Sequence, residues 1–247
     1  METKSWLERL PWVKIGLAVL FFVIYTVLTS WKFALLIMWG IGVHENGHLW
    51  AMRRYGMPTK GFFFLPFLGG VALGTGTLSS RWKHFVMVIM GPIWGLLSAV
   101  PSVIAYLISG NLYFAAGAIF ICFFNLFNLV PMSILDGGQM TSSIAFSFNK
   151  TVGLVVIGAG VALAALILPR FNFLIAILVI WTGINQFMNE YSLRHKPDSM
   201  HKMDARYKTY AILSYLGLAA LFYFSISAIA AWSHIGTLKQ VFTILLK

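Results

Sequence analysis

The sequence predicts an all-α polytopic membrane protein with six to seven transmembrane helices. Hydrophobic residues make up 59% of its 247 positions and charged residues only 10%, a balance far from that of a soluble globular domain. A bilayer core about 30 Å thick needs about 20 apolar residues per helix, and stretches of this size recur along the chain. We expect seven spans, at about 12–30, 33–53, 84–108, 112–131, 151–168, 171–189 and 209–232.

The apolar segment between the second and third expected spans, KGFFFLPFLGGVALGTGTLSS, is a poor candidate for a continuous helix. It is broken by Pro66, Gly69, Gly70, Gly74 and Gly76. A re-entrant loop or a short β-hairpin fits better, with residues 62–76 as the candidate strand region. Such backbone persists at membrane depth only where protein or a water-filled cavity covers its polar groups. The segment is therefore expected to line a cavity.

Basic residues predict the orientation, because cytoplasmic loops of membrane proteins are rich in Lys and Arg. With the N-terminus inside the cell, all but four of the 18 Lys and Arg residues fall on the cytoplasmic side, the exceptions being Lys32, Arg170, Lys239 and Lys247. Multi-pass insertion in the cell membrane thus accounts for the net charge of +11. A nucleic-acid partner is not needed to explain it.

The two ends of the chain carry weaker signals. The stretch METKSWLERLPWVK is basic and precedes a long apolar run without a small-residue cleavage site, which is typical of a retained signal anchor. Residues from 233 onward are predicted to form either an interfacial amphipathic tail or the frayed end of the last helix.

Acidic residues are few, and two of them stand out. Five of the seven lie in terminal or loop segments or at the end of a span. Glu45 instead lies inside the second expected span, and Asp136 lies just past the fourth, in NLFNLVPMSILDGGQM. An ionisable group within a span costs about 2.5–3.5 kcal/mol on insertion scales. By default, such a residue indicates a functional site.

Glu45 belongs to an H-E-x-x-H motif with His44 and His48. Residues four apart share one helix face, so both imidazoles can point at a common ion, while Glu45 reaches the water beside it. A hydrolytic zinc site uses three protein ligands and one open position. Asp136 is a better third ligand than the single cysteine, Cys122, which has no evident reason to ionise. The remaining histidines are interpreted as ordinary interfacial residues at loop edges: His84, His195, His201 and His234.

Two sequence elements resemble the site-2 protease family of intramembrane zinc metalloproteases. HENGHLWAMRRYG is similar to the family's HExGH element, and NLVPMSILDGGQ to its N-x-x-P-x-x-x-L-D-G-G element, about 90 residues later. Gly91-Pro92, early in the third expected span, is similar to a glycine-proline pair that the family often carries. The resemblance covers about residues 35–145.

The resemblance implies one Zn²⁺ bound by His44, His48 and Asp136. Glu45 would be the general base that takes a proton from the attacking water and passes it to the leaving amine. Asn128 would hydrogen-bond the substrate backbone or the developing oxyanion, and the nearby Asn125 is a second candidate for substrate contact.

The segment after H-E-x-x-H would capture an extended substrate by β-addition, with Phe64 and Gly70 as candidate contacts. The substrate would be a membrane-anchored protein cut in or near its transmembrane segment, on the cytoplasmic side. A regulatory membrane partner is left open. On this interpretation residues 1–247 form a single transmembrane domain with a catalytic core at about 33–145, and 151–247 supply additional C-terminal spans. Gly47, a small residue beside the ligands, is expected to mark a point where the helix needs close approach.

Two other functions remain open. The protein could be a multispan zinc transporter, since His, Glu and Asp within spans also build ion and proton relays, or an inactive relative that binds transmembrane partners without cutting them. Only one compact ligand set is visible in the sequence, which argues against transport. Glu45 is intact, which argues against an inactive relative.

Overall fold

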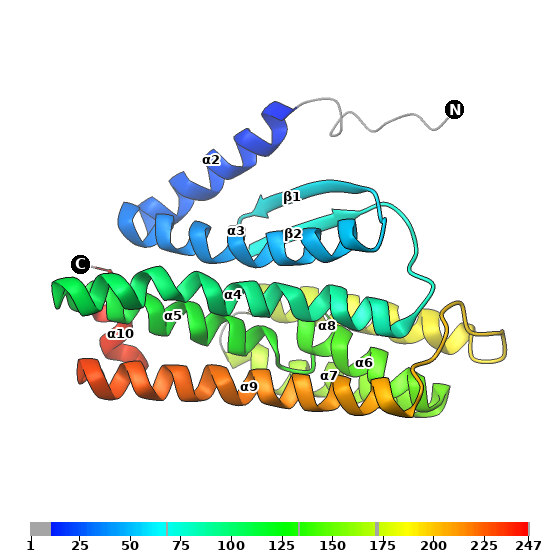
Figure 1. Ribbon diagram of the computed structural model, residues 1–247. Coiled ribbons are helices and arrows are strands. Elements are labelled where there is room, and N and C mark those ends of the chain that lie inside the picture. The colour runs from blue at the N-terminus through cyan, green and yellow to red at the C-terminus, as the bar shows by residue number, and fades with distance from the viewer. Residues whose placement is uncertain (1–10, 68, 133, 171–172, 247) are drawn as a thin grey trace.

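The computed structural model describes residues 11–67, 69–132, 134–170 and 173–246. Its helices are α2 (Pro11–Leu28), α3 (Trp31–Arg54), α4 (Arg81–Ser109), α5 (Leu112–Asn128), α6 (Asp136–Phe148), α7 (Lys150–Ile167), α8 (Phe173–Ser192), α9 (Ala205–Ser233) and α10 (Leu238–Leu245). A 3-10 turn (Leu168–Arg170) follows α7, and the strands are β1 (Thr59–Leu65) and β2 (Gly69–Gly74). Figure 1 shows α3, α4, α5 and α9 as long, roughly parallel helices with α2 inclined away from them.

Helix boundaries follow from capping side chains. Six helices begin after a residue whose side chain accepts a hydrogen bond from a backbone N–H of the first turn; these residues are Ser30, Ser80, Asn111, Asn149, Asp204 and Thr237. Gly110, with φ of 66°, ends α4 in the left-handed conformation that glycine adopts without steric cost. Local polar chemistry therefore sets where the apolar helices start and stop.

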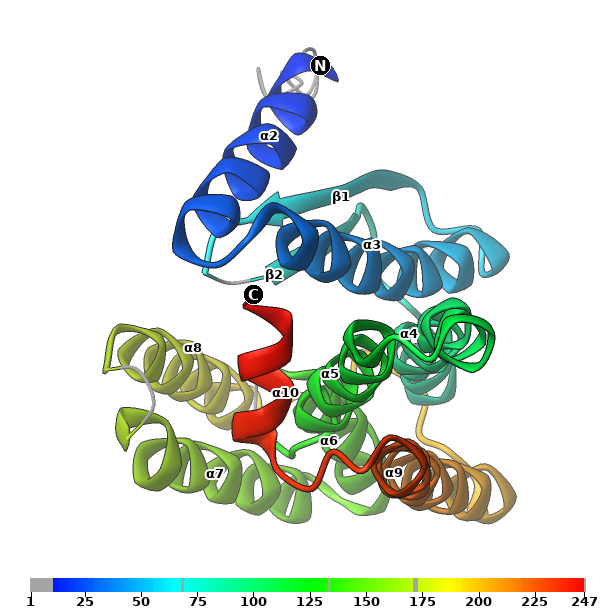
Figure 2. The same ribbon diagram turned by 90° about the vertical axis from the view of Figure 1, so that its left-hand side faces the viewer.

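The segment after α3 forms a β-hairpin, which confirms one of the two predicted alternatives. β1 and β2 pair antiparallel, with Phe62 opposite Ala72 and Phe64 opposite Gly70. The hairpin lies beside α3 on the side of α2 (Figures 1 and 2), where β2 packs against α3 and β1 against α2. β2 is thus the strand held nearest to the H-E-x-x-H helix.

Glycines line the contact between α3 and α4, which is the most extensive helix contact in the described chain. A Cβ atom at Gly47 would lie 2.2 Å from the backbone oxygen of Met90 and 3.0 Å from Cβ of Trp94. Small residues allow helix backbones to approach closely within a membrane. The expectation that Gly47 marks a close approach is therefore confirmed.

Four helices of the described chain are long and apolar enough to cross a membrane: α2, α4, α7 with its 3-10 turn, and α9. The seven spans expected from the sequence are not all recovered by this criterion. α5 has only 17 residues, and the polar residues of H-E-x-x-H lower the hydropathy of α3. Orientation in the membrane stays a prediction.

Some of the predicted features lie outside the described residues. These are the start of the sixth expected span, at 171, and three of the counted basic residues, Lys4, Arg9 and Lys247.

The structure adds one helix that was not expected and decides between two alternatives at the C-terminal end of the described chain. α6 fills the gap left between the fourth and fifth predicted spans, where two glycines and three serines disfavour a helix; it is stabilised by packing against α4 and α7. The segment after α9 forms a separate amphipathic helix, α10, which agrees with the predicted amphipathic tail and not with a frayed end. His234 ends α9 in the left-handed conformation, and Thr237 with Gln240 forms a capping box at the start of α10. Its buried Val241 and Leu245 pack toward α5.

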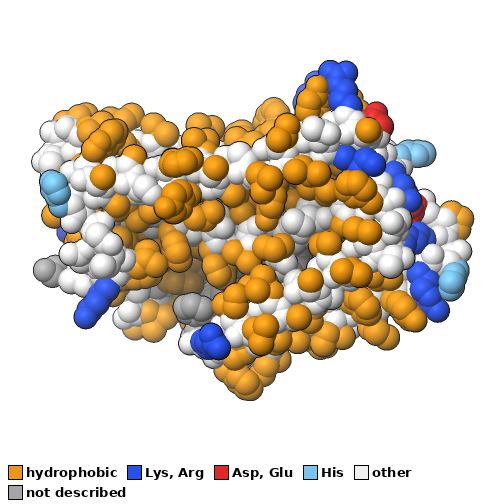
Figure 3. Space-filling view, turned by 90° about the horizontal axis from the view of Figure 1, so that it is seen from below, with side chains coloured by type: hydrophobic (Ala, Val, Ile, Leu, Met, Phe, Trp, Pro, Cys, Tyr) orange, Lys and Arg blue, Asp and Glu red, His pale blue; other side chains and the backbone are white. Residues whose placement is uncertain are grey.

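The outer surface agrees with a membrane environment. Figure 3 shows hydrophobic side chains spread over the face viewed, with Lys and Arg gathered mainly at one end of the long helices. Many large apolar side chains are exposed, including Val27, Ile108 and Leu166, at 79%, 82% and 69%. A soluble monomer rarely exposes so much contiguous apolar surface.

We expect Gly47→Leu to destabilise the protein by about 1–3 kcal/mol, because the added side chain overpacks the α3–α4 contact. Thermal unfolding of the purified protein in detergent measures the effect. Gly217→Leu is the matched control, since a Cβ at Gly217 on α9 meets no atom within 4 Å. Equal melting temperatures for the two variants would contradict the close packing inferred at Gly47.

Candidate metal centre

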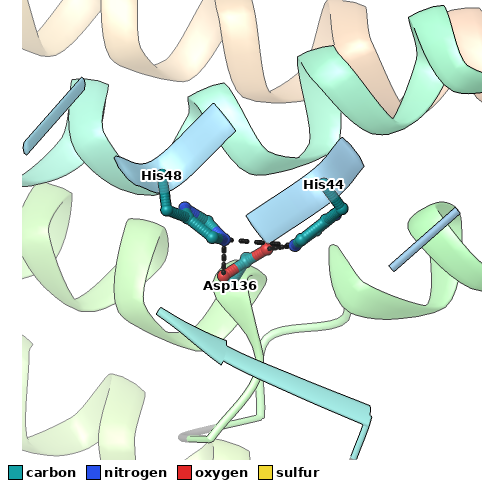
Figure 4. A group of neighbouring side chains, drawn as sticks. All are labelled: His44, His48 and Asp136. Carbon is teal, nitrogen blue, oxygen red and sulfur yellow. Dashed lines mark hydrogen bonds and ion pairs between the residues drawn. The ribbon is translucent and has the colours of Figure 1, made fainter. Parts of the chain in front are cut away.

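Three predicted ligands come together in the interior. His44 and His48 lie one turn apart on α3, and Asp136 is the first residue of α6. All three are buried, and they form a group whose ligand atoms lie within 4.8 Å of one another. Figure 4 shows the two imidazoles pointing toward the same carboxylate. The helical spacing thus aligns the histidines, and the fold supplies the acid from a distant segment.

Nδ1 of each imidazole, the ring nitrogen that faces away from Asp136, has one hydrogen-bond partner. Nδ1 of His44 lies 2.7 Å from Oδ1 of Asn125, and Nδ1 of His48 lies 3.0 Å from the backbone oxygen of Met87. Both partners are acceptors, so each Nδ1 carries the hydrogen and donates it. Each Nε2 of a neutral ring is then left with a lone pair, and these two atoms face each other at 3.1 Å.

The carboxylate completes the arrangement. Oδ2 of Asp136 lies 3.0 Å from Nε2 of His44, and Oδ1 lies 3.4 Å from Nε2 of His48. Oδ2 is buried and accepts no hydrogen bond from the residues that the structure describes. Buried lone pairs that converge without a proton between them repel one another unless a cation lies between them.

The distances fit zinc. Zn–N and Zn–O bonds of about 2.0–2.1 Å in tetrahedral geometry place neighbouring donor atoms about 3.3–3.4 Å apart. The two Nε2 atoms lie 3.1 Å apart, and His44 Nε2 and His48 Nε2 lie 3.0 and 3.4 Å from Oδ2 and Oδ1 of Asp136, respectively, which is close to that spacing. His44, His48 and Asp136 therefore form a buried cluster that can bind a metal ion, and two imidazoles with one carboxylate are donor groups that zinc accepts.

One side of the centre is closed by α4. A Cβ atom at Gly91 would lie 2.3 Å from Nε2 of His48 and 2.8 Å from Nε2 of His44. Glycine is therefore required here by close approach to the ligands. The Gly91-Pro92 pair singled out in the sequence lies directly against the metal centre.

The other side opens into a cavity of about 630 Å³. Glu45 lines it together with the three ligands, Asn128 and residues of β2. A Cβ atom at Gly70 would lie 2.5 Å from Cγ of Glu45, so the backbone of β2 packs directly on the predicted base. The hairpin lines the cavity, as the sequence predicted for this segment.

The remaining predicted contact residues differ in their placement. Asn125 and Asn128 both line the cavity. Asn125 is fully buried, however, and both polar atoms of its amide are engaged, by His44 and by the carbonyl of Ile121. Phe64 is not among the residues that line the cavity; its ring packs against Phe21 of α2, with 5.2 Å between centroids. A role for Phe64 in substrate contact stays a prediction.

The other candidate ligands lie outside the cluster. Cys122 is a buried core residue of α5. His195, His201 and His234 are exposed, as expected for interfacial residues. His84 differs from that expectation, because it faces α6 and its Nδ1 lies 2.7 Å from Oγ of Ser143.

The turn before Asp136 is held by α9 and α7, which the sequence did not connect to the site. A Cβ at Gly137 would lie 2.0 Å from the carbonyl oxygen of Leu129, so the turn closes tightly on itself. Oη of Tyr215 on α9 donates to the same carbonyl at 2.6 Å. On α7, a Cβ at Gly160 would lie 2.5 Å from the carbonyl oxygen of Pro131. No local pattern around Tyr215 or Gly160 predicts these contacts.

Comparison with known families agrees with this geometry. Residues 32–114 match the family model of Peptidase family M50. This segment is a domain of the site-2 protease family. The M50 domain contains α3 with H-E-x-x-H, the β-hairpin and Gly91-Pro92 on α4. The match ends before Asp136, so the third ligand rests on the distances above. No curated protein matches the chain.

We expect Gly91→Ala to lower zinc occupancy strongly, because the added methyl group occupies the space of both imidazole Nε2 atoms. Metal analysis of the purified protein measures zinc per chain. Gly217→Ala is the control, since its methyl group meets open space. Full zinc occupancy in Gly91→Ala would show that α4 does not bound the site as described.

Tyr215→Phe should weaken zinc binding severalfold and lower stability by about 0.5–1.5 kcal/mol, the net value of one hydrogen bond. The reason is that the Leu129 carbonyl loses its donor and the turn before Asp136 loosens. Competition with a chelator measures zinc affinity. Tyr223→Phe is the control, at a residue of the same helix that is 61% exposed, and it should leave zinc affinity unchanged. An equal effect of both changes would show that the Tyr215 hydrogen bond does not support the metal centre.

Proposed function

We propose that the protein is an intramembrane zinc metalloprotease that hydrolyses a peptide bond in or near the transmembrane segment of a membrane-anchored protein. The observation that carries the proposal is the convergence of two imidazole Nε2 atoms and one carboxylate within 3.4 Å of one another, next to Glu45 in the same cavity. The M50 match over residues 32–114 supports the same reaction class.

Zinc, when bound, polarises the scissile carbonyl and makes water acidic enough to attack near neutral pH. Glu45 then acts as general base: its carboxylate takes the proton of the attacking water and delivers it to the leaving amine nitrogen. The backbone of β2 beside Gly70 holds the Glu45 side chain from one side. Asn128, at the cavity wall, provides an amide N–H for the developing oxyanion.

The substrate is proposed to bind as an added strand. A helical transmembrane segment hides its peptide bonds, so it must be extended before cleavage. The described sheet has two strands, which leaves β2 one edge without a strand partner. Residues of β2 line the cavity and residues of β1 do not, so an extended segment paired to β2 would pass the metal centre.

The cavity wall suits an apolar substrate. Side chains from α3, α5 and α8 and from the turn before α6 make its lining mainly apolar, among them Ile41, Phe124, Ile134 and Val179. Such a surface solvates the side chains of a membrane-spanning segment, whereas the polar groups of the site are limited to a few residues. The proposed partners are thus a transmembrane protein substrate and the lipid bilayer, and a regulatory membrane partner is left open.

We further propose that α3, α5 and α8 cross the membrane together with the four long apolar helices, which gives seven spans. The N-terminus then lies in the cytoplasm. Arg53 and Arg54 end α3 about one to three turns after the histidines, so the metal centre lies toward the cytoplasmic side.

The alternatives find less support. The described residues contain one group of metal-ligating type, His44, His48 and Asp136, and a transport path needs further sites along the membrane normal. An inactive relative has no need of an acid at position 45, where Glu45 faces the cavity.

We expect Glu45→Gln to retain zinc but to cut about 10²- to 10⁴-fold more slowly, the usual contribution of a general base. Quantitative proteomics compares membranes of cells that carry the unmutated protein or Glu45→Gln. A full-length membrane protein should accumulate only with Glu45→Gln. The unmutated protein, once purified, should cleave that purified membrane protein.

Glu190→Gln, which removes an acid at the end of α8, is the matched control and should cleave normally. Chelation should stop cleavage, and added zinc should restore it. Zinc transport that persists in Glu45→Gln, with no cleavage by the unmutated protein, would refute the protease assignment.

A further inference from the structure

The two metal-binding imidazoles are oriented by different kinds of partner. Nδ1 of His48 donates to a backbone oxygen, that of Met87, which any residue at position 87 would supply. Nδ1 of His44 donates to a side chain, that of Asn125 on α5. The orientation of His44 therefore depends on one particular residue choice, outside both the H-E-x-x-H and the L-D-G-G elements.

The amide of Asn125 is itself fixed in one orientation. The residue is fully buried, and its Nδ2 donates to the carbonyl oxygen of Ile121 at 2.9 Å. Turning the amide over would place Nδ2 against the N–H of His44 and Oδ1 against that carbonyl, so two hydrogen bonds would become two repulsive contacts. Oδ1 consequently faces His44 as an acceptor.

The space for this amide is provided by Gly95 on α4. A Cβ atom at Gly95 would lie 1.9 Å from Oδ1, 2.4 Å from Cγ and 2.6 Å from Nδ2 of Asn125. No side chain at position 95 is compatible with the observed position of Asn125. Gly95 and Asn125 are thus a matched pair across the α4–α5 contact.

We propose that Asn125 is a positioning residue that fixes the tautomer and ring orientation of His44 for metal binding, and that Gly95 reserves the space for its amide. Oδ1 holds the hydrogen of His44 on Nδ1, which leaves Nε2 with its lone pair directed at the metal centre. Such outer partners of metal-binding histidines contribute about 10- to 100-fold to metal affinity. The proposal rests on the proposed zinc site and assigns Asn125 to His44 rather than to the substrate.

A merely structural role for Asn125 predicts a different outcome. If the amide only joined helices by hydrogen bonds, its loss would lower stability without selectively weakening the metal site, and an amide supplied from another helix would not restore metal affinity. The position of Gly95 makes it possible to test whether an amide supplied from another helix restores metal affinity. An asparagine at position 95 can place its amide in the space that Asn125 occupies, provided that position 125 is emptied.

The test measures Co²⁺ and Zn²⁺ affinity of the full-length protein in detergent, by chelator competition, together with the visible absorption spectrum of bound Co²⁺. Asn125→Leu keeps the branched side-chain shape and the number of non-hydrogen atoms but removes the acceptor, and it should weaken metal binding about 10- to 100-fold and alter the Co²⁺ spectrum. Asn185→Leu is the matched control. Like Asn125, Asn185 on α8 donates from Nδ2 to a carbonyl of its own helix, that of Trp181, at 2.9 Å. Replacing Asn185 should leave the metal affinity and the Co²⁺ spectrum unchanged.

A relocation variant decides the case even if Asn125→Leu folds poorly. Asn125→Gly should bind metal weakly, and the double change Asn125→Gly with Gly95→Asn should recover at least tenfold in affinity and regain the original Co²⁺ spectrum. Unmutated metal affinity in Asn125→Leu, or no recovery in the double variant, would overturn the positioning role while the zinc site stands. Absence of stoichiometric metal binding by the unmutated protein would instead overturn the zinc site, and this proposal with it.

Discussion

Mutual repulsion among buried lone pairs is the constraint on which the rest of the structure depends. Two imidazole nitrogens and a carboxylate meet in the interior, and the hydrogens of both rings are held on the opposite side. Burying such groups without a compensating charge is costly, so the arrangement favours a bound divalent cation. α3, α4, α5 and α6 each contribute a ligand or a group that orients a ligand.

Close packing allows these helices to reach the same point. Gly47, Gly91 and Gly95 have no polar chemistry, yet a single added carbon at each would collide with a backbone oxygen, an imidazole or an amide. Within a membrane the hydrophobic effect does not drive helices together, so association relies on close contact through small residues and on hydrogen bonds. These glycines of α3 and α4 are in this sense part of the metal centre.

The centre also depends on helices beyond the M50 match at 32–114. Asp136 begins α6, and the turn before it is fixed by Tyr215 of α9 and packed against Gly160 of α7. These contacts join parts of the chain separated by 86 residues in the case of Tyr215 and Leu129. The C-terminal helices therefore contribute to the site as well as to the membrane-embedded surface.

The sequence by itself determined the membrane class, the hairpin as one of two alternatives, and the three residues His44, His48 and Asp136 that form the buried cluster. Hydropathy, glycine content and helical period act locally, and the residue types of the two motifs singled out Asp136. It did not reveal α6, whose glycines and serines argue against a helix until α4 and α7 cover it, and it left the segment of α10 open between an amphipathic tail and a frayed end. Only the tertiary structure decided that Gly91 touches the ligands, that Asn125 faces His44 and that Tyr215 holds the turn before Asp136. Those roles arise from contacts between segments far apart in the chain, and no local pattern carries that information.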